Sequence, residues 1–136
     1  MNEKIVKVVA GVIYYEPTEE ILIARRIKGD EGAAGKWEFP GGKIESGENI
    51  NESIKRELKE EFSLEITPVK TITTTQTKYP TRTIEIVFIH CTCNKKELEM
   101  NTYDHSEYKW IKKEELIKYE FAKADEAFID FYLKKG

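Results

Sequence analysis

The sequence is poor in cysteine, in excess charge of either sign and in long hydrophobic runs, and each shortage excludes a class of protein. Only two of the 136 residues are cysteine, Cys91 and Cys93. So few thiols exclude a disulfide-stabilised secreted scaffold, and a reducing, cytoplasmic location is the expected one. The two cysteines stand two positions apart in a strand-like run, which predicts two small buried side chains on one face.

The charge balance and the apolar runs limit the partners. The formal net charge is −3, so no overall positive field attracts nucleic acid or an anionic membrane. The longest apolar run near the N-terminus, VVAGVIYY at residues 8–15, is too short to span a bilayer. It also lacks the small-residue cleavage pattern of a signal peptide. We therefore expect neither a nucleic-acid nor a membrane partner.

The remaining composition is that of a soluble globular domain, with 40% hydrophobic and 35% charged residues, and the length allows one core. Strand-like and helix-like segments alternate. We predict strands at 5–15, 21–26, 37–39, 71–77, 83–93 and 108–111, a helix at 49–62, a helical turn or two at 112–119 and a closing helix at 124–135. The apolar face of the closing helix is predicted to be Phe128, Phe131 and Tyr132. This interleaving favours an α/β fold, a mixed sheet covered by helices.

The helix at 49–62 carries some of its charges in an unusual place. At about 100° per residue, Glu57 and Glu61 fall inside or beside its apolar stripe, and Glu60 lies about 80° to one side. The stripe consists of Ile50, Ile54 and Leu58. A carboxylate turned inward is costly unless it is paired or protonated. A hard divalent cation such as Mg²⁺ would resolve that cost, because it prefers oxygen ligands. The alternative is an ordinary solvated helix with an ion pair between Glu52 and Arg56.

Directly before this helix lies PGGKIESGE, a glycine-rich loop whose backbone can approach a phosphate or bind a metal through a carbonyl. Loop and helix together, GGKIESGENINESIKRELKEEFSL, resemble the Nudix box, which here spans residues 42–64. The matching positions are Gly42, Glu48, Arg56, Glu57, Leu58, Glu60, Glu61 and Leu64. Ser63 stands where the family has glycine. The surrounding strands also follow the family order, so the resemblance covers nearly the whole chain.

The resemblance implies one Nudix hydrolase domain over residues 1–136, folded as an α/β/α sandwich around a mixed sheet. It further implies hydrolysis of a nucleoside diphosphate linked to another group, with Mg²⁺ or Mn²⁺ as cofactor. By resemblance, Glu57, Glu60 and Glu61 are the catalytic metal ligands, and the Gly42 carbonyl lies near the metal. Also by resemblance, the roles of Glu48 and Arg56 are structural, a salt bridge that fixes the loop against the helix.

The segment WEFPGGKIE and the C-terminal half are most similar to the MutT-type subgroup of nucleoside triphosphate pyrophosphohydrolases. In that subgroup, the place of Asp104 holds a further acidic metal ligand, although this residue could simply form a turn. Asp125 corresponds to the residue that reads the base. An ionised aspartate only accepts hydrogen bonds, so it suits a cytosine amino group or a guanine edge. Alternatively, Asp125 could cap the last helix.

Four further residues are candidates for substrate binding. Tyr79 and Arg82 flank a predicted turn, where a ring could stack on a base and a guanidinium could touch base or phosphate. Arg25 and Lys43 are placed to contact phosphates. Each of the four could instead face solvent. His90 and His105 are predicted to be incidental to catalysis.

These features predict an enzyme that hydrolyses a (deoxy)nucleoside triphosphate to a monophosphate and pyrophosphate, and that could cleanse modified nucleotides from the pool. Its partner would be a small nucleotide, and its assembly a monomer or homodimer. One alternative is a nucleotide-sugar or dinucleotide diphosphatase. Another is a non-catalytic nucleotide-sensing or RNA-binding Nudix module, against which the intact glutamates argue. The departure at Ser63 predicts a helix end in left-handed backbone space, with catalysis preserved.

Overall fold

The computed structural model describes residues 4–29 and 32–135. Its strands are β1 (Ile5–Tyr15), β2 (Glu20–Arg26), β3 (Trp37–Glu38), β4 (Gly41–Lys43), β5 (Thr67–Tyr79), β6 (Arg82–Cys93) and β7 (His105–Ile111). Its helices are α1 (Ile50–Phe62), the 3₁₀ helix η1 (Lys113–Lys118) and α2 (Lys123–Lys135). The strands form one mixed sheet with the order β3-β2-β1-β6-β5, to which β4 adds beside β1 and β7 beside β2.

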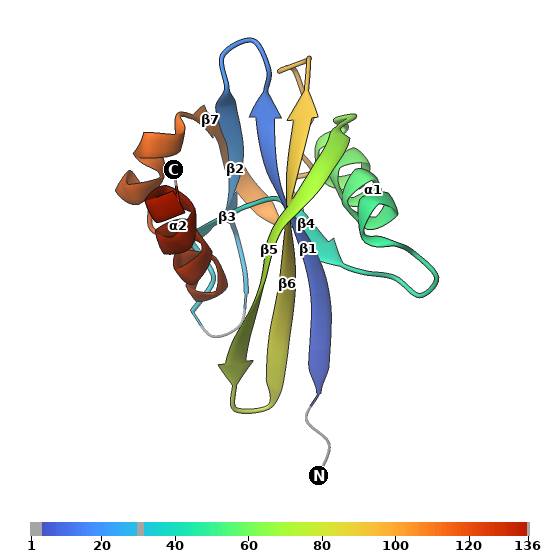
Figure 1. The fold of residues 1–136 in the computed structure, drawn as a ribbon, viewed down its shortest axis with the longest axis vertical. Helices are drawn as coiled ribbons and strands as arrows, with labels where there is room; N and C mark the ends of the chain where they lie inside the picture. The colour runs from blue at the N-terminus through green and yellow to red at the C-terminus, as the bar shows by residue number, and fades with distance from the viewer. Residues whose placement is uncertain (1–3, 30–31, 136) are drawn as a thin grey trace.

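Strand β1 runs through the middle of this sheet. It pairs in parallel with β6 along its whole length, from Ile5 opposite Thr83 to Tyr15 opposite Cys93, and antiparallel with β2 and β4. Helix α1 lies on one side of the sheet, and α2 with η1 lies on the other (Figure 1). The architecture is therefore the α/β/α sandwich with a mixed sheet that the sequence predicts.

Two hydrophobic cores fill the spaces between the sheet and the helices. Alternate residues of β1 face opposite sides: Val9 and Ile13 pack with α1, whereas Ala10 and Val12 pack with α2. The predicted stripe of α1 is buried through Ile54 and Leu58, and Phe62 joins them. Both cysteine side chains are free thiols buried in the same core, as expected.

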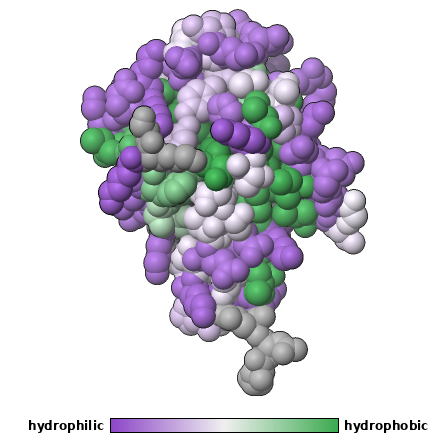
Figure 2. Space-filling model, in the orientation of Figure 1, coloured by the Kyte–Doolittle hydropathy of each residue, from purple (hydrophilic) through white to green (hydrophobic). Residues whose placement is uncertain are grey.

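The closing helix differs from its prediction at one position. Phe128 is fully buried and Tyr132 packs against the same core, but Phe131 is 42% exposed. Ile129 is buried in its place. Positions 128, 129 and 132 lie on one face of a helix, while position 131 lies about 100° from position 132. Figure 2 shows hydrophilic residues over most of one face of the molecule, with hydrophobic patches across its middle.

Helix α1 has well-defined ends. Asn49 caps its start, and a reciprocal pair of hydrogen bonds joins the Asn49 and Glu52 side chains to each other's backbone N–H groups. Glu52 is thus engaged in a capping box rather than in the alternative ion pair with Arg56. At the other end Ser63 adopts φ 52° and ψ 35°, and its N–H donates to the Lys59 carbonyl at 3.0 Å. The predicted left-handed conformation is confirmed.

None of the helices in the described ranges has the length and apolar character needed to cross a bilayer.

Candidate active site

The Arg56 guanidinium organises the acidic face of α1. Its Nε donates to Glu48 at 2.6 Å, and its Nη2 donates to the Lys43 carbonyl at 3.1 Å. Its Nη1 lies 3.1 Å from Glu57 and 3.3 Å from Glu60. The hydrogen bond from Arg56 helps to lower the pKa of Glu48 to about 2. The salt bridge predicted between Glu48 and Arg56 is present, and it ties the glycine-rich loop to the helix.

The glycine pair of that loop makes two close approaches. A Cβ atom on Gly42 would lie 2.4 Å from Oε1 of Glu57, and a Cβ atom on Gly41 would lie 1.9 Å from the Val9 carbonyl oxygen. Gly41 and Gly42 pair with Ala10 and Val9 of β1. Both positions therefore require glycine, because neither has room for a side chain. Gly41 lets β4 lie close to β1, and Gly42 leaves room for the Glu57 carboxylate.

The three glutamates differ in their surroundings. The side chain of Glu57 is 13% exposed and that of Glu61 is 18% exposed, whereas Glu60 is 57% exposed. Burial raises the pKa of Glu57, and Arg56 partly opposes that shift. Burial and the nearby charge of Asp104 raise the pKa of Glu61. Two carboxylates that are costly to ionise thus lie on one face of α1.

These carboxylates provide a donor set whose chemistry fits a hard divalent cation. Within the described part of the chain, the buried Oε2 of Glu61 has no hydrogen-bond partner. Among those same residues, no three His, Cys, Asp or Glu side chains already converge as a metal site. The guanidinium of Arg56 stands between Glu57 and Glu60 instead. To gather around one ion, these two side chains must turn away from Arg56.

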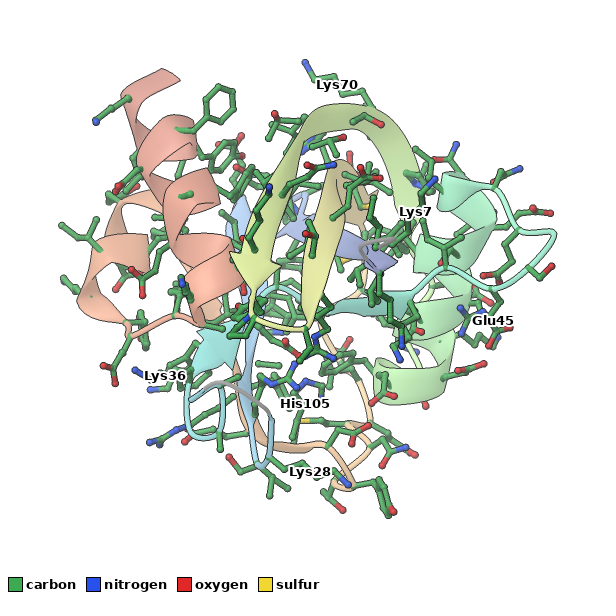
Figure 3. All side chains as sticks on the ribbon, turned by 90° about the horizontal axis from the view of Figure 1, so that it is seen from below. Lys7, Lys28, Lys36, Glu45, Lys70 and His105 are labelled. Atoms are coloured by element: carbon green, nitrogen blue, oxygen red, sulfur yellow. The ribbon has the colours of Figure 1, made fainter. Side chains whose placement is uncertain are left out.

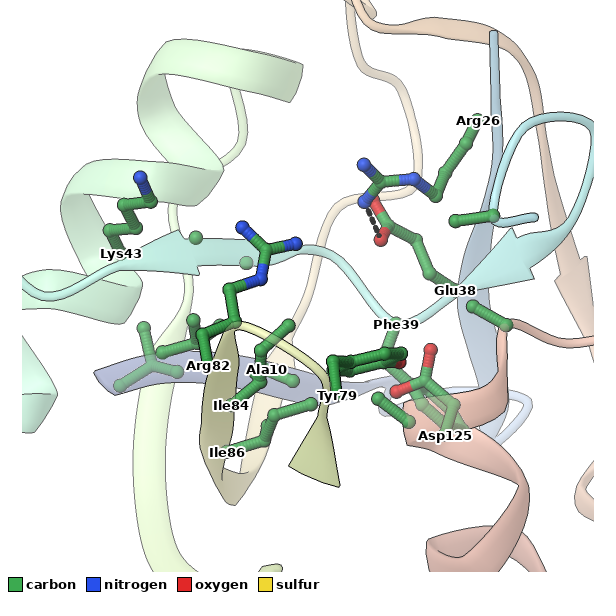
Figure 4. A pocket seen from close by; sticks show the side chains of 17 residues that line it. Ala10, Arg26, Glu38, Phe39, Lys43, Tyr79, Arg82, Ile84, Ile86 and Asp125 are labelled. Carbon is green, nitrogen blue, oxygen red and sulfur yellow. Dashed lines mark hydrogen bonds and ion pairs between the residues drawn. The ribbon is translucent and has the colours of Figure 1, made fainter. Parts of the chain in front are cut away.

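A pocket of about 250 Å³ opens beside this acidic face. Its lining includes Gly42, Lys43, Tyr79, Arg82 and Asp125. In Figure 4, Lys43 and Arg82 lie toward one end, while Glu38, Arg26 and Asp125 lie at the other. Four of the five sequence-predicted substrate residues are thus brought together here.

Arg25 is the exception, because it does not line this pocket. Its Nη1 lies 3.1 Å from Glu107 of β7, and its Nε donates to the Gly35 carbonyl at 2.9 Å. Successive side chains of a strand point to opposite faces, so the next residue, Arg26, reaches the pocket instead. There Arg26 donates to Glu38 at 2.7 Å. Of these two neighbouring arginines, the structure therefore places Arg26 and not the predicted Arg25 in the pocket lining.

Asp125 lines the pocket and is 5% exposed. Helix α2 begins at Lys123, so Asp125 is inside its first turn, and the alternative role as N-cap is wrong. Burial raises the pKa of Asp125 well above its ordinary value, the charge of Glu38 adds to this shift, and Arg26 opposes it. The carboxyl group is therefore biased toward its neutral form, which can donate as well as accept a hydrogen bond. That form widens the set of base edges it could bind.

Asp104 and His105 lie where β7 begins. Asp104 is 3.8 Å from Lys28, and its charge is felt by Glu61. His105, predicted from the sequence to be incidental, is buried between Glu38 and Glu61. The sequence reasoning missed Arg26, Glu38 and His105. Strand alternation could have indicated Glu38, because its neighbours in WEF are both buried apolar residues.

Comparisons with known proteins agree with this geometry. The NUDIX domain family matches residues 6–132. The chain is 35% identical over 98 residues to an 8-oxo-dGTP diphosphatase of Proteus vulgaris, covering 72% of this chain and 86% of that protein. It is 31% identical over 130 residues to a CTP pyrophosphohydrolase of Escherichia coli K12, covering 96% and 93%. The structure of a MutT protein from Methanosarcina mazei Go1 superposes with a TM-score of 0.85 at 22% identity, covering 99% and 97%.

A sheet between two helical layers, with a glycine pair packed against the acidic face of α1, defines the class of protein. The chain belongs to the Nudix family and is a hydrolase of that family. Within the family its likeness is to the MutT type.

Proposed function

We propose that this enzyme hydrolyses a nucleoside triphosphate to a nucleoside monophosphate and pyrophosphate, with Mg²⁺ as cofactor and Mn²⁺ as a substitute. The observation that carries the proposal is that one pocket connects the acidic face of α1 with the buried Asp125. The pocket includes Gly42, which touches the Glu57 carboxylate, and it extends to the buried Asp125. One small molecule can therefore present a base to Asp125 and phosphates to α1.

The cationic residues of the pocket supply the phosphate contacts in this proposal. Arg26, Lys43 and Arg82 line the first pocket and also a second hollow beside it, where Lys28 joins them. Positive side chains there would orient a polyphosphate and offset its charge. The Tyr79 ring lines the first pocket and would stack on a base.

The acidic residues of α1 supply the cation site and the base. Glu57, Glu60 and Glu61, with the Gly42 carbonyl and Asp104 nearby, would hold the ion. When bound, a divalent cation neutralises phosphate oxygens and acidifies a water molecule. A carboxylate of this cluster would take the proton from the attacking water. Glu48 and Arg56 hold the loop and helix in register.

The choice of base is the finer part of the proposal. The relatives reported above are named for 8-oxo-dGTP and for CTP. A carboxyl group that both donates and accepts suits the edge of an oxidised guanine or of a modified cytosine. We propose that such nucleotides are the substrates and that the enzyme cleanses them from the cytoplasmic pool.

A nucleotide panel tests the function directly. The protein is incubated with natural and oxidised triphosphates, nucleotide sugars and dinucleotides in Mg²⁺, and pyrophosphate is resolved from phosphate. Pyrophosphate from a triphosphate supports the proposal, whereas cleavage of only sugars or dinucleotides would contradict it.

Two substitutions test the cation site. Glu57→Gln and Glu61→Gln should each lower kcat by about 100-fold or more, because each removes a charged ligand without opening a cavity. The control is Glu65→Gln, just past the same helix, whose carboxylate is 86% exposed. Turnover near that of the wild type in both α1 variants at saturating Mg²⁺ would refute the role of this face.

A further inference from the structure

The buried His105 side chain joins the two halves of the proposed site. It is 4% exposed, and its Nε2 lies 2.7 Å from Oε2 of Glu38 on β3. Its Nδ1 lies 3.8 Å from Oε2 of Glu61 on α1. In Figure 3, His105 is seen between α1 and the segment before β3 that carries Lys36. The imidazole ring therefore spans the distance between a pocket residue and a candidate metal ligand.

The Glu38 end of this bridge belongs to the nucleotide pocket. The other oxygen of Glu38 accepts a hydrogen bond from Arg26, and both residues line the pocket. An ionised carboxylate only accepts hydrogen bonds. With Glu38 as the acceptor, Nε2 of His105 is the donor of their hydrogen bond.

The Glu61 end is incomplete in its hydrogen bonding. In the ranges that the structure describes, neither Nδ1 of His105 nor Oε2 of Glu61 has a hydrogen-bond partner, although both atoms are buried. Buried polar atoms without partners are costly and uncommon. The Phe62 ring, 5.5 Å away between centroids, holds the imidazole plane against α1. The two atoms lie 3.8 Å apart, so a small movement of either side chain brings them within hydrogen-bond distance, and a proton on Nδ1 or on Oε2 then completes the bond.

We propose that His105 is a positioning residue that couples the nucleotide pocket to the metal-binding face of α1. Its Nε2 fixes Glu38 and thereby Arg26, and its Nδ1 orients the inner oxygen of Glu61. Residues that hold metal ligands in this way usually govern metal affinity. The coupling is reciprocal: nucleotide bound against Arg26 and Glu38 favours the ligand orientation of Glu61, and a bound cation favours the pocket. This inference rests on the proposed function, since it concerns the same site.

Two isosteric substitutions separate the two ends of the bridge. A glutamine amide can occupy the place of Nε2 and keep the bond to Glu38, whereas an asparagine amide occupies the place of Nδ1 and keeps the contact with Glu61. The matched control is His90→Gln, because His90 is the other histidine and lies on β6 against Tyr14. For each variant we would measure the Mn²⁺ dissociation constant by electron paramagnetic resonance without nucleotide. The kcat, KM and melting temperature would be measured alongside it.

The coupling predicts that the two His105 variants differ in which quantity changes, the Mn²⁺ affinity or the KM. His105→Gln should weaken Mn²⁺ binding by about 10-fold or more with little change in KM. His105→Asn should raise KM by about 10-fold while Mn²⁺ affinity stays within about twofold. His90→Gln should leave all of these values near those of the wild type. The inference would be overturned if both His105 variants lost Mn²⁺ affinity and raised KM together, in step with a lower melting temperature. It would also be overturned if neither variant changed either quantity.

The Mn²⁺ measurement keeps the two hypotheses distinguishable. If the wild-type protein cleaves no triphosphate, the proposed function fails, and the Mn²⁺ constants of the variants still decide whether His105 orients Glu61. A wild-type protein that does not bind Mn²⁺, or a Glu61→Gln variant that binds it normally, would overturn the inference itself.

Discussion

Alanine at Gly42 should displace the Glu57 carboxylate and little else. The new Cβ atom would lie 2.4 Å from Oε1 and 2.5 Å from Cδ of Glu57. Non-bonded atoms rest about 3.5 Å apart, so the carboxylate must retreat by about 1 Å. A misplacement of about 1 Å at a reacting centre can cost about 100-fold in rate. The displaced group is the end of a rotatable side chain, so we expect a loss of only about 1 kcal/mol in the free energy of unfolding.

The neighbouring Gly41→Ala variant is the matched comparison. Its Cβ atom would lie 1.9 Å from the Val9 carbonyl oxygen and 2.8 Å from the Val9 carbonyl carbon, both backbone atoms of β1. Backbone in the middle of a sheet cannot rotate away, so β4 itself must move from β1. We expect a loss of about 3 kcal/mol in the free energy of unfolding, at the upper end of the cost of overpacking.

The assay pairs steady-state kinetics in Mg²⁺ with urea unfolding of both variants. The expected pattern is a nearly stable but slow Gly42→Ala enzyme and an unstable Gly41→Ala protein. If Gly42→Ala keeps wild-type kcat, or if it is as unstable as Gly41→Ala, then the space beside Glu57 is not what the site needs and the reasoning is refuted.

Two further substitutions probe stability. Asp125→Asn removes an ionisation that burial disfavours. In the wild type, burial raises the pKa of Asp125 in the folded state above its unfolded value of 3.8. The stability of the wild type is therefore fully present below pH 3.8 and falls as pH rises toward the folded pKa. A difference of one between the folded and unfolded pKa values corresponds to about 1.4 kcal/mol, so the variant should gain stability over the wild type as pH rises in urea unfolding, and parallel pH profiles would contradict this. Ser63→Gly should raise the free energy of unfolding by about 1 kcal/mol, or roughly 3 °C in melting temperature, because glycine adopts φ 52° without strain. A less stable Ser63→Gly protein, or one with altered kcat, would mean that the serine side chain has another role.

The sequence allowed the layers, the mixed sheet and the acidic helix to be predicted because each depends on local periodicity or on a contiguous motif. Elements whose position depends on partners distant in sequence were harder to predict. Strand β4 consists of two glycines and a lysine, which have little strand propensity, and it exists because the β1 backbone accepts it. Strand β5 begins at Thr67, earlier than the threonine-rich run suggested, because β6 continues opposite it as far as Thr92.

In the candidate site, too, residues on one contiguous segment could be predicted, whereas residues whose neighbours come from distant segments could not. The glutamates of α1 and the arginine that holds them could be predicted from one helix. Arg26 was missed because alternation says only that Arg25 and Arg26 face opposite sides. Which of the two faces the pocket depends on the folded sheet, where the pairing of β2 with β7 is irregular between them. His105 was missed because its two carboxylate neighbours come from β3 and α1, and only the folded chain brings these segments together.

The central place of β1 also governs how the chain acquires its fold. Strand β1 pairs with β6, and partners such as Val9 and Val87 lie more than half the chain apart. Contacts of that range form slowly, because a long loop must close before they contribute. On the ribosome, β1 would emerge long before β6. Helix α1, which covers Val9 and Ile13, is made in between, but the edge of β1 that pairs with β6 and the face with Ala10 and Val12 stay uncovered. Until then its residues are available to other chains and to chaperones, so the chain is most prone to aggregate between the emergence of β1 and that of β6.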